Sequence, residues 1–507
     1  MDTGVFCGLQ NHFGVLETSW VGSIPTRSRQ FNCTLFNFMQ QAWSFLFARL
    51  PLLPSRIFYG MVIYYNSIEG FRTIIRKQDE VGNLKTKIFR GHILKMLSIS
   101  LAVAVSSGLS ACSKPSSAAA SDDLMSGISK TTAVSRSPDG QFIESYSKFA
   151  LGLFRETMSG KENSLVSPLS VILALSMTAN GADANTLDEM EKLLGQGIPL
   201  KDLNAYLYSY ADGLPDEEKS KLRIANSIWF RDDEGRLTVE KEFLQTNADY
   251  YSAAAYKSKF DDATLKDIND WVEKNTEGMI DKILDSINPD AVMYLINAIV
   301  FDAQWDKVYS KENLQGGSFI SASGATEDAE FMNSEEELYL DDGMSTGFIK
   351  PYSKGLYSFA AILPNEGISV DEYVSSMTGN GFQEMIKGAE STLVTASLPK
   401  FSYSYTISMN DALKKLGMPT AFSSEKADFS RLGKSSRGNL YIGEVLHKTF
   451  INVDELGTKA GAVTKVEIED ESYIETKIVR LDRPFIYAII DNSTGLPIFI
   501  GTVNTVK

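Results

Sequence analysis

The spacing of apolar residues divides the chain from residue 141 onward into helical and strand-like segments. Apolar side chains recur every three or four positions over 149–160, 184–195 and 265–280, which predicts amphipathic helices. The stretch SPLSVILALSMTANGA, residues 167–182, is apolar on nearly every side. A helix of that kind is expected inside a protein core rather than on its surface.

Strand-like runs dominate the later part of the same region. They are rich in β-branched and aromatic residues and occupy 222–230, 293–305, 355–366, 392–407, 440–455, 483–491 and 497–504. Helices therefore prevail first and long strands afterwards, and no internal repeat is visible. This order predicts one α+β domain over residues 141–507 with antiparallel sheets.

One segment, residues 454–477, combines the alternation of a strand with the composition of an exposed loop. It reads DELGTKAGAVTKVEIEDESYIETK. From Thr458 every second residue is small or apolar, the residues between are mostly charged, and the pattern fails at Asp470. We therefore expect a loop that can also pair as a strand, with one face on a core. That face comprises Thr458, Ala460, Ala462, Thr464, Val466 and Ile468.

Composition narrows the possible functions. The 507 residues are 43% hydrophobic and 22% charged, as in globular proteins. The net charge of -15, with no basic stripe, argues against a nucleic-acid partner. After Cys112 the chain has no cysteine and a single histidine, His447, so disulfides, cysteine nucleophiles and Cys/His zinc sites are excluded there. A Ser-His-Asp triad would depend on His447 alone.

The region before the domain has the layout of a secretory signal with a lipid attachment site. A basic stretch, 85–95, precedes an uncharged apolar run that is too short and too Ser-rich for a good membrane span. The residues LSAC at 109–112 resemble the bacterial lipobox, in which the cysteine is lipidated and becomes the first mature residue. We therefore predict that 84–111 form a lipoprotein signal peptide and that Cys112 carries the lipid. The alternative is a chance apolar patch with an isolated cysteine.

Two further expectations follow for the front of the chain. Residues 1–83 are predicted to be absent from the mature protein, with translation starting near Met61, Leu84 or Met96. Residues 112–140, rich in Ser and Ala, are predicted to form a flexible tether. We therefore expect a lipid-anchored protein of the bacterial cell envelope. Ser113, directly after the lipidated cysteine, is compatible with the outer membrane. The sequence leaves open whether the protein faces the periplasm or the cell surface.

Six stretches within residues 141–507, which follow one another in the family's order, resemble the serpin family. They are SPLSVILALSMTANGA with TLDEMEKLLG, INDWVEKNTEGMI, LINAIVFDAQW, LPKFSYSYTISMNDALKKLGM, LHKTFINVDELGTKAGA and RPFIYAIIDNSTGLPIFIGTVN. The resemblance implies a single large domain with three β-sheets, eight to nine helices and an exposed reactive loop near the C-terminus. It also implies a monomeric protease inhibitor rather than an enzyme, without cofactor or metal.

The resemblance further implies how such an inhibitor works. A serine endopeptidase, or also a cysteine endopeptidase, cuts the loop and forms a covalent acyl-enzyme. The cut loop then joins the main sheet as an added strand and traps the enzyme. The hinge where insertion begins comprises Glu455, Gly457, Thr458, Lys459, Ala460, Gly461 and Ala462. Lys459 departs from the acidic residue usual there, but its predicted face is towards solvent, so we expect little effect.

Other matched positions concern the sheet that must open. The resemblance places Ser167, Ser170, Asn297 and His447 in a buried polar cluster, the shutter, that holds two strands together. It places Trp305 at the point where insertion starts, beside an ion pair between Lys400 and Glu455.

The scissile bond is less clearly marked than the hinge. Counting forward from Glu455 by the family's spacing gives Glu471-Ser472, our first choice. Counting back from Pro484 gives Tyr473-Ile474, and both bonds stay open. A Glu471 cut suits a protease with a basic specificity pocket, and a Tyr473 cut suits a chymotrypsin-like protease.

Three rival functions stay open at this point. A non-inhibitory serpin acting as a binding or chaperone-like envelope protein would carry Pro or large charged residues on the inward hinge face. A hydrolase would need His447 in an open cleft, whereas its place in a strand-like run predicts burial. An adhesive surface lipoprotein is suggested by the predicted tether.

Overall fold

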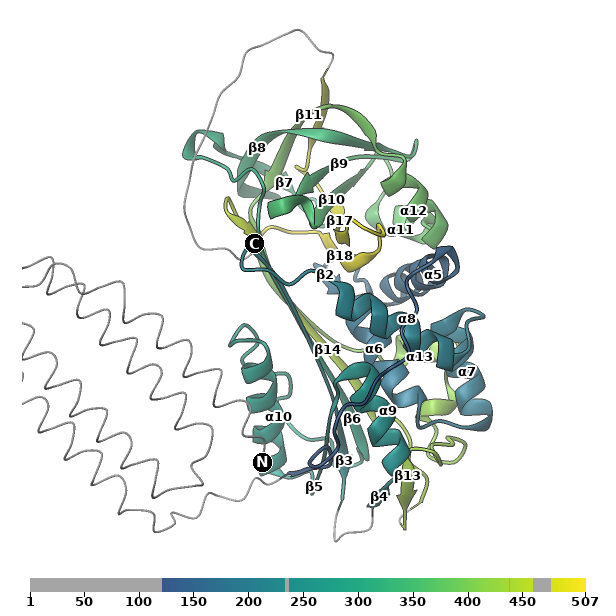
Figure 1. Ribbon diagram of the computed structural model, residues 1–507. Coiled ribbons are helices and arrows are strands. Elements are labelled where there is room, and N and C mark those ends of the chain that lie inside the picture. The colour runs from purple at the N-terminus through teal and green to yellow at the C-terminus, as the bar shows by residue number, and fades with distance from the viewer. Residues whose placement is uncertain (1–120, 233–236, 437, 459–475) are drawn as a thin grey trace, which may run out of the picture. The chain divides into compact units, whose positions relative to one another are not determined.

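A seven-stranded sheet and a nine-stranded sheet organise the chain (Figure 1). The computed structural model describes residues 121–232, 237–436, 438–458 and 476–507, all within one compact unit that begins at Pro115. Within these ranges there are nine α-helices and three sheets, as the α+β prediction requires. The helices are α5 (Gly140–Thr157), α6 (Pro168–Ala179), α7 (Ala184–Gly195), α8 (Leu200–Gly213), α9 (Lys241–Tyr251), α10 (Asp262–Asn275), α11 (Val370–Ser376), α12 (Gly379–Lys387) and α13 (Asn410–Leu416).

The seven-stranded sheet contains the longest uninterrupted strand pair, β3 with β6. In spatial order its strands are β1 (Asp122–Asp123), β5 (Ala254–Ser258), β3 (Ser220–Arg231), β6 (Met293–Gln304), β15 (Gly457–Thr458), β14 (Glu444–Val453) and β12 (Phe401–Ser408).

The nine-stranded sheet packs at one end of the first. Its order is β16 (Lys477–Arg480), β11 (Glu390–Pro399), β8 (Thr326–Asp341), β9 (Ser345–Pro351), β10 (Tyr357–Pro364), β17 (Phe485–Asp491), β18 (Pro497–Val503) and β2 (Ser164–Val166), with β7 (Leu314–Ile320) paired to β8. A third sheet joins β13 (Gly433–Ser435) to β4 (Leu237–Val239).

The prediction of antiparallel sheets was wrong at three strand pairs. β5 with β3, β14 with β6, and β16 with β11 run parallel. Parallel neighbours need a crossover connection. The crossover from β6 to β14 contains much of the other sheet, so local periodicity could not reveal it.

The seven-stranded sheet is covered on both faces, as Figure 1 shows with α10 on one side and α6, α8 and α9 on the other. Every residue of α6 is buried, which confirms the prediction of a core helix from its apolar surface. Ser167 caps the start of the helix, because its hydroxyl accepts from the Ser170 N–H, and Pro168 is the first helical residue. A second hydrophobic cluster lies under α10.

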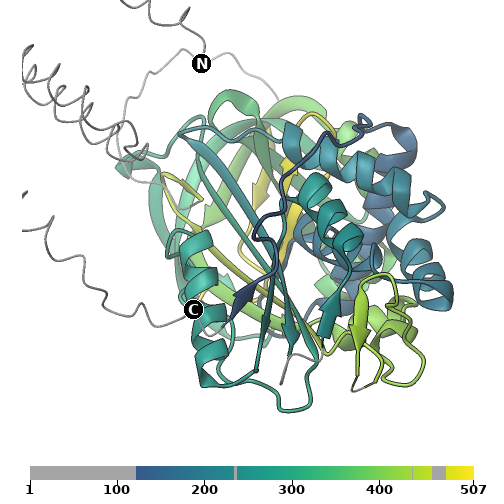
Figure 2. The same cartoon turned by 60° about the horizontal axis from the view of Figure 1, so that its bottom comes forward.

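The structure differs from the tether predicted over 112–140 in the part that it describes. Leu124, Met125 and Ile128 pack against the core, and the Leu124 N–H donates to the Ala255 carbonyl at 2.9 Å. Figure 2 shows this segment, in purple, running along the body. The prediction of a tether rested on the average composition of residues 112–140. That average does not show that three apolar residues are placed where they can pack against the core.

The predicted signal peptide, Cys112 and residues 1–83 lie outside the described residues. Among the helices that are described, none combines the length and the apolar character needed to cross a bilayer.

Candidate functional site

The seven-stranded sheet is partly open between β6 and β14. The two strands pair directly over residues 294–298 and 444–448, with a constant offset of 150 residues, since Lys448 faces Ala298 (448 − 298 = 150). The same offset would bring Val453 opposite Ala303 (453 − 303 = 150). Instead Val453 pairs with Thr458, and Thr458 pairs with Ala303. The strands are therefore paired directly over five residue pairs, here called the seam. Beyond the pair of Lys448 and Ala298 they separate around β15, and this part of the sheet is here called the opening.

Gly457 is the residue that lets β15 approach β6. A Cβ atom at this position would lie 2.1 Å from the carbonyl oxygen of Ala303, far inside van der Waals contact. Only glycine can fit without moving one of the two strands. The close approach explains why the predicted hinge contains glycine here.

Thr458 faces the core, as the alternation of the segment predicts. Its side chain is 2% exposed, and its hydroxyl lies 2.6 Å from the hydroxyl of Tyr352. The Tyr352 ring stacks on Trp305 with ring centroids 4.5 Å apart. The first inward-facing residue of the segment thus already occupies an interior position.

Trp305 holds the turn that leads into β15. Its indole N–H donates to the carbonyl of Asp454 at 2.9 Å, and its backbone N–H donates to the carbonyl of Leu456 at 2.9 Å. The backbone N–H of Tyr309 donates to the carbonyl of Glu455, also at 2.9 Å. These bonds fix the start of the segment against the residues that follow β6.

The expected ion pair between Lys400 and Glu455 is present. The Lys400 ammonium lies 2.6 Å from Glu455 and 2.6 Å from Glu330. Hydrogen bonding to Lys400 holds the pKa of Glu455 below its ordinary value. Burial alone would lower the pKa of Lys400, but the hydrogen bonds to Glu330 and Glu455 raise it. Because the pair is partly exposed, its contribution to stability is expected to be about 0–1 kcal/mol.

A second ion pair, between Lys350 and Glu336, was not predicted from the sequence. Lys350 donates to Glu336 at 2.8 Å, and both side chains are almost fully buried. The Lys350 ammonium also lies 4.4 Å from the ring centre of Tyr309. Burial lowers the pKa of Lys350, although Glu336 opposes that effect. No sequence pattern marks such a pair, because its two residues come from different strands.

The shutter residues lie beneath the seam. His447 is fully buried, its Nδ1 lies 2.9 Å from Oδ1 of Asn297, and its Nε2 accepts from the backbone N–H of Ser167 at 3.0 Å. The imidazole therefore carries its proton on Nδ1 and is neutral. Burial lowers the pKa of His447 to about 3. Because both ring nitrogens are engaged, His447 cannot serve as the base of a hydrolase.

Asn297 extends this cluster across three elements. Its amide donates to the carbonyl of Ser170 at 2.6 Å and to the side chain of Asn226, which the sequence did not single out, at 2.5 Å. The Ser167 hydroxyl donates to the carbonyl of Ile498 at 2.8 Å. The Ser170 hydroxyl is buried without a hydrogen-bond partner in the described part of the chain. His447 and Asn297 also face each other across the seam, so a strand added there would separate them.

The remaining predicted site residues lie outside the described residues: Lys459, Ala460, Gly461, Ala462, Glu471, Ser472, Tyr473 and Ile474. In the ranges that the structure does describe, no group of three or more His, Cys, Asp or Glu side chains could hold a metal ion.

The buried imidazole predicts a loss of stability in acid. The folded-state pKa of His447 lies below its ordinary value near 6.5, so the unfolded chain takes up the proton first. Stability is therefore lost as pH falls from about 6.5 towards 3, by about 2 kcal/mol at pH 5. Denaturant unfolding of the wild type and of His447→Gln at pH 8 and pH 5 measures this. The variant should lose about 2 kcal/mol less; equal losses would contradict the assignment.

A side chain at position 457 should expel β15 from the opening. In Gly457→Val the Cβ would collide with the Ala303 carbonyl, so the amides of Trp305 and Tyr309 should lose their partners and exchange hydrogen faster. Hydrogen exchange with peptide-level resolution measures this. Gly316→Val is the matched control, since a Cβ there meets no atom within 4 Å. Unchanged protection in Gly457→Val would show that β15 does not depend on the close approach.

Comparison with known proteins agrees with this geometry. The family model "Serpin (serine protease inhibitor)" matches residues 144–506. The structure of a thermophilic serpin, tengpin, in the native state is similar at 56% identity and a TM-score of 0.74, covering 76% of this chain and 99% of tengpin. Serpin-Z4 of Hordeum vulgare is 30% identical over 70% of this chain and 94% of its own length. A thyroxine-binding globulin in complex with thyroxine is 26% identical, with a TM-score of 0.64, over 72% of this chain and all of the globulin.

The matched region contains the opening, the seam and the shutter described above, and it ends one residue before the C-terminus. The chain belongs to the serpin family, whose members are mostly protease inhibitors and not enzymes with catalytic turnover.

Proposed function

We propose that this protein is a suicide inhibitor of serine endopeptidases, and also of cysteine endopeptidases, which it traps by inserting its cut reactive loop into the seven-stranded sheet. The observation that carries the proposal is β15. Gly457 and Thr458 already lie between β6 and β14, and the Thr458 side chain is buried there.

The chemistry needs no catalytic group from the inhibitor. The nucleophile of the protease attacks the carbonyl carbon before the scissile bond, the amide bond breaks, and the new amine leaves with a proton from the protease's histidine. An ester, or a thioester with a cysteine protease, then joins the N-terminal part of the loop to the enzyme. Water would hydrolyse this bond unless insertion deforms the protease first.

Insertion has a favourable free energy. A strand over residues 458–468 would gain about ten hydrogen bonds, each worth about 0.5–1.5 kcal/mol. Burial of Val466 and Ile468 would add about 1.5–3 kcal/mol each. The total reaches about 10 kcal/mol, so the uncut protein would be a kinetically trapped form rather than the most stable one.

The alternative is a non-inhibitory serpin that binds other molecules in the envelope. A thyroxine-binding globulin is among the similar structures, so the family includes a member named for binding. The hinge of this chain favours inhibition, because the residues on its predicted inward face, Thr458, Ala460 and Ala462, are small.

We further propose that the mature protein starts at a lipidated Cys112 and is held on the bacterial envelope, at the outer membrane. Support comes from the basic stretch, the apolar run and the LSAC box in the sequence. The described domain would then sit near the membrane and intercept proteases there.

The direct test is incubation of the purified protein with trypsin-, elastase- and chymotrypsin-like proteases, followed by denaturing electrophoresis. Inhibition predicts a complex that survives SDS. Sequencing the released C-terminal peptide decides between cleavage at Glu471-Ser472 and at Tyr473-Ile474. Cleavage by every protease without a complex would support the non-inhibitory alternative.

A charge on the inward face of the hinge should turn the inhibitor into a substrate. In Thr458→Arg an unpaired cation would have to enter the space beside Tyr352 and Trp305, which costs several kcal/mol and slows insertion. We expect the protease to be released active, with more cut inhibitor and at least tenfold less complex. Lys459→Glu is the control, since its predicted face is towards water. Equal complex yields from Thr458→Arg and the wild type would contradict the inward assignment.

Replacing Cys112 should release the protein from the membrane. In bacteria, Cys112→Ser should no longer incorporate labelled palmitate and should leave the membrane fraction. Mass spectrometry of the wild type should find a mature N-terminus at lipidated Cys112. An intact N-terminus at Met1, or membrane attachment of Cys112→Ser, would overturn the anchor without affecting the inhibitory mechanism.

A further inference from the structure

The chain enters the described domain at one end of the seven-stranded sheet. Asp122 of β1 pairs with Lys257 of β5, and Lys257 pairs with Phe230 of β3. Phe230 pairs in turn with Met293, the first residue of β6. These four residues form one row across four neighbouring strands, here called the entry row. β1 and β6 run in the same direction and both begin there, so the chain before Asp122 leaves the sheet at this end.

Contacts of the segment after β1 fix the place where the chain enters. The backbone N–H and the hydroxyl of Thr131 donate to the carboxylate of Asp249 on α9, at 2.6 and 2.8 Å. Gln245 on the same helix donates to the Ser129 carbonyl at 2.9 Å. Between Cys112 and the entry row the chain therefore has only nine residues (121 − 112 = 9), whereas 27 residues lie between Cys112 and α5 (139 − 112 = 27).

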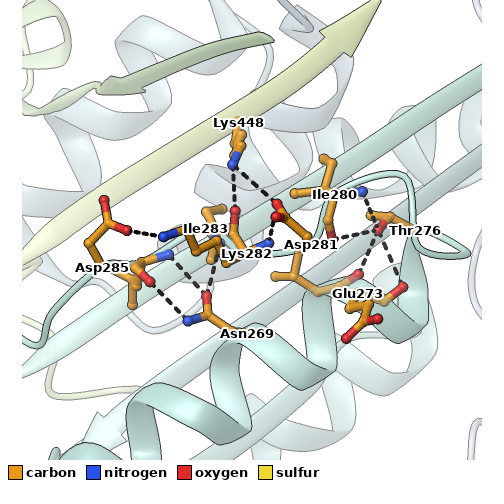
Figure 3. Close-up of polar contacts among 11 residues, drawn as sticks. Asn269, Glu273, Thr276, Ile280, Asp281, Lys282, Ile283, Asp285 and Lys448 are labelled. Carbon is orange, nitrogen blue, oxygen red and sulfur yellow. Dashed lines mark hydrogen bonds and ion pairs between the residues drawn. The ribbon is translucent and has the colours of Figure 1, made fainter.

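The start of β6 is fixed as well. The segment that leads from α10 to β6 is tied to the helix by the side chain of Asn269 (Figure 3). The Asn269 side-chain carbonyl accepts from the backbone N–H groups of Ile283 and Leu284, at 2.9 and 3.0 Å. At the end of β3, the Arg231 guanidinium donates to the Asn288 carbonyl at 3.1 Å. The entry row is therefore a fixed end of the sheet.

An inserted loop would leave the sheet at this same row. In β15 the numbers of the residues paired with β6 add up to 761, since Thr458 faces Ala303 (458 + 303 = 761). A strand that keeps this register along β6 brings Ile468 opposite Met293 (468 + 293 = 761). The alternation of the segment fails two residues later, at Asp470. The strand thus spans β6 from the opening to the entry row, and the cut end of the loop emerges beyond that row.

Little space separates the two points where the chain leaves the sheet. An inserted strand beside β6 would lie four strand positions from β1, which corresponds to about 19 Å. The chain from Cys112 to the entry row reaches at most about 35 Å when fully extended. A protease of about 200 residues has a diameter of about 40 Å. Attached at Glu471 or Tyr473, the trapped enzyme must share the space between the sheet and the lipid on Cys112.

We propose that loop insertion carries the trapped protease to the membrane-facing end of the domain, where it lies between the entry row and the bilayer. This inference rests on the proposed function, because it needs both a lipidated Cys112 and an inserted loop. Before cleavage the loop starts at the opening, at the other end of β6 and about 35 Å from the entry row. The inhibitor therefore meets its target away from the membrane and then holds it against the membrane.

A dye on the loop tests the direction of this movement. The chain has no cysteine after Cys112, so Asp470→Cys gives a single labelling site in the lipidated protein. The protein is placed on the outside of vesicles that contain an acceptor lipid, and a protease that is not trapped cuts the loop beyond Glu471. Energy transfer from the dye to the lipid should rise at least twofold, because the dye moves about 35 Å towards the bilayer.

Ile478→Cys is the matched control for the dye experiment. Ile478 is 76% exposed on β16, which stays paired with β11 in the nine-stranded sheet. A dye at this position lies after the cut and is not carried along with the inserted strand. Its energy transfer should therefore stay unchanged when the loop is cut.

A longer linker tests whether the space at the entry row is limited. Twenty Gly and Ser residues inserted after Ser113 add a flexible chain that spans about 25 Å. On vesicles, this variant should at least double the fraction of protease that ends in the complex that survives SDS. In detergent, the variant and the wild type should give equal yields, which shows that the insertion leaves folding and inhibition intact.

The melting temperature of the cut protein separates failure of this inference from failure of the proposed function. If cutting raises the melting temperature but energy transfer from the dye at position 470 stays equal or falls, the inference is overturned. If the melting temperature does not rise, the loop does not insert, and the proposed function fails together with the inference. Equal complex yields on vesicles with both linker lengths would contradict the shared space. A wild type without lipid on Cys112 would overturn the inference and leave the inhibitory mechanism intact.

Discussion

The structure depends on the parallel pairing of β6 with β14, which extends over only five residue pairs. β6 and β14 are joined at 294–298 and 444–448, and at the top Thr458 stands between Val453 and Ala303. Backbone N–H and C=O groups inside a sheet need hydrogen-bond partners, and a strand edge that lacks them accepts another strand. Because β15 already lies in the opening, the sheet favours further insertion of the residues that follow β15.

Two groups of contacts lie where the sheet would have to open further. At the opening, Trp305 fixes the turn before β15. On the inner face, His447 and Asn297 meet across the seam. A movement of β14 away from β6 would disturb both groups. This arrangement suits a protein that must stay closed for long periods and open once.

The sequence predicted those parts of the site that follow from local patterns. Alternation alone placed Thr458 on the inward face, and the apolar surface of α6 placed that helix in the core. The resemblance brought together His447 and Asn297, and Lys400 and Glu455. It could not reveal the buried pair of Lys350 and Glu336, because that pair depends on which strands become neighbours. The segment before α5 was misjudged for another reason: a few anchoring side chains outweigh its polar average.

The central claim is that the segment from Thr458 onward becomes an interior strand once the loop is cut. The most direct measurement is the melting temperature of the protein before and after nicking of the loop by a protease that it does not trap. An added strand worth about 10 kcal/mol predicts a rise of more than about 10 °C. It also predicts that the amides of β6 and β14 above the seam become protected from hydrogen exchange. An unchanged or lower melting temperature, with those amides still exchanging freely, would contradict the account.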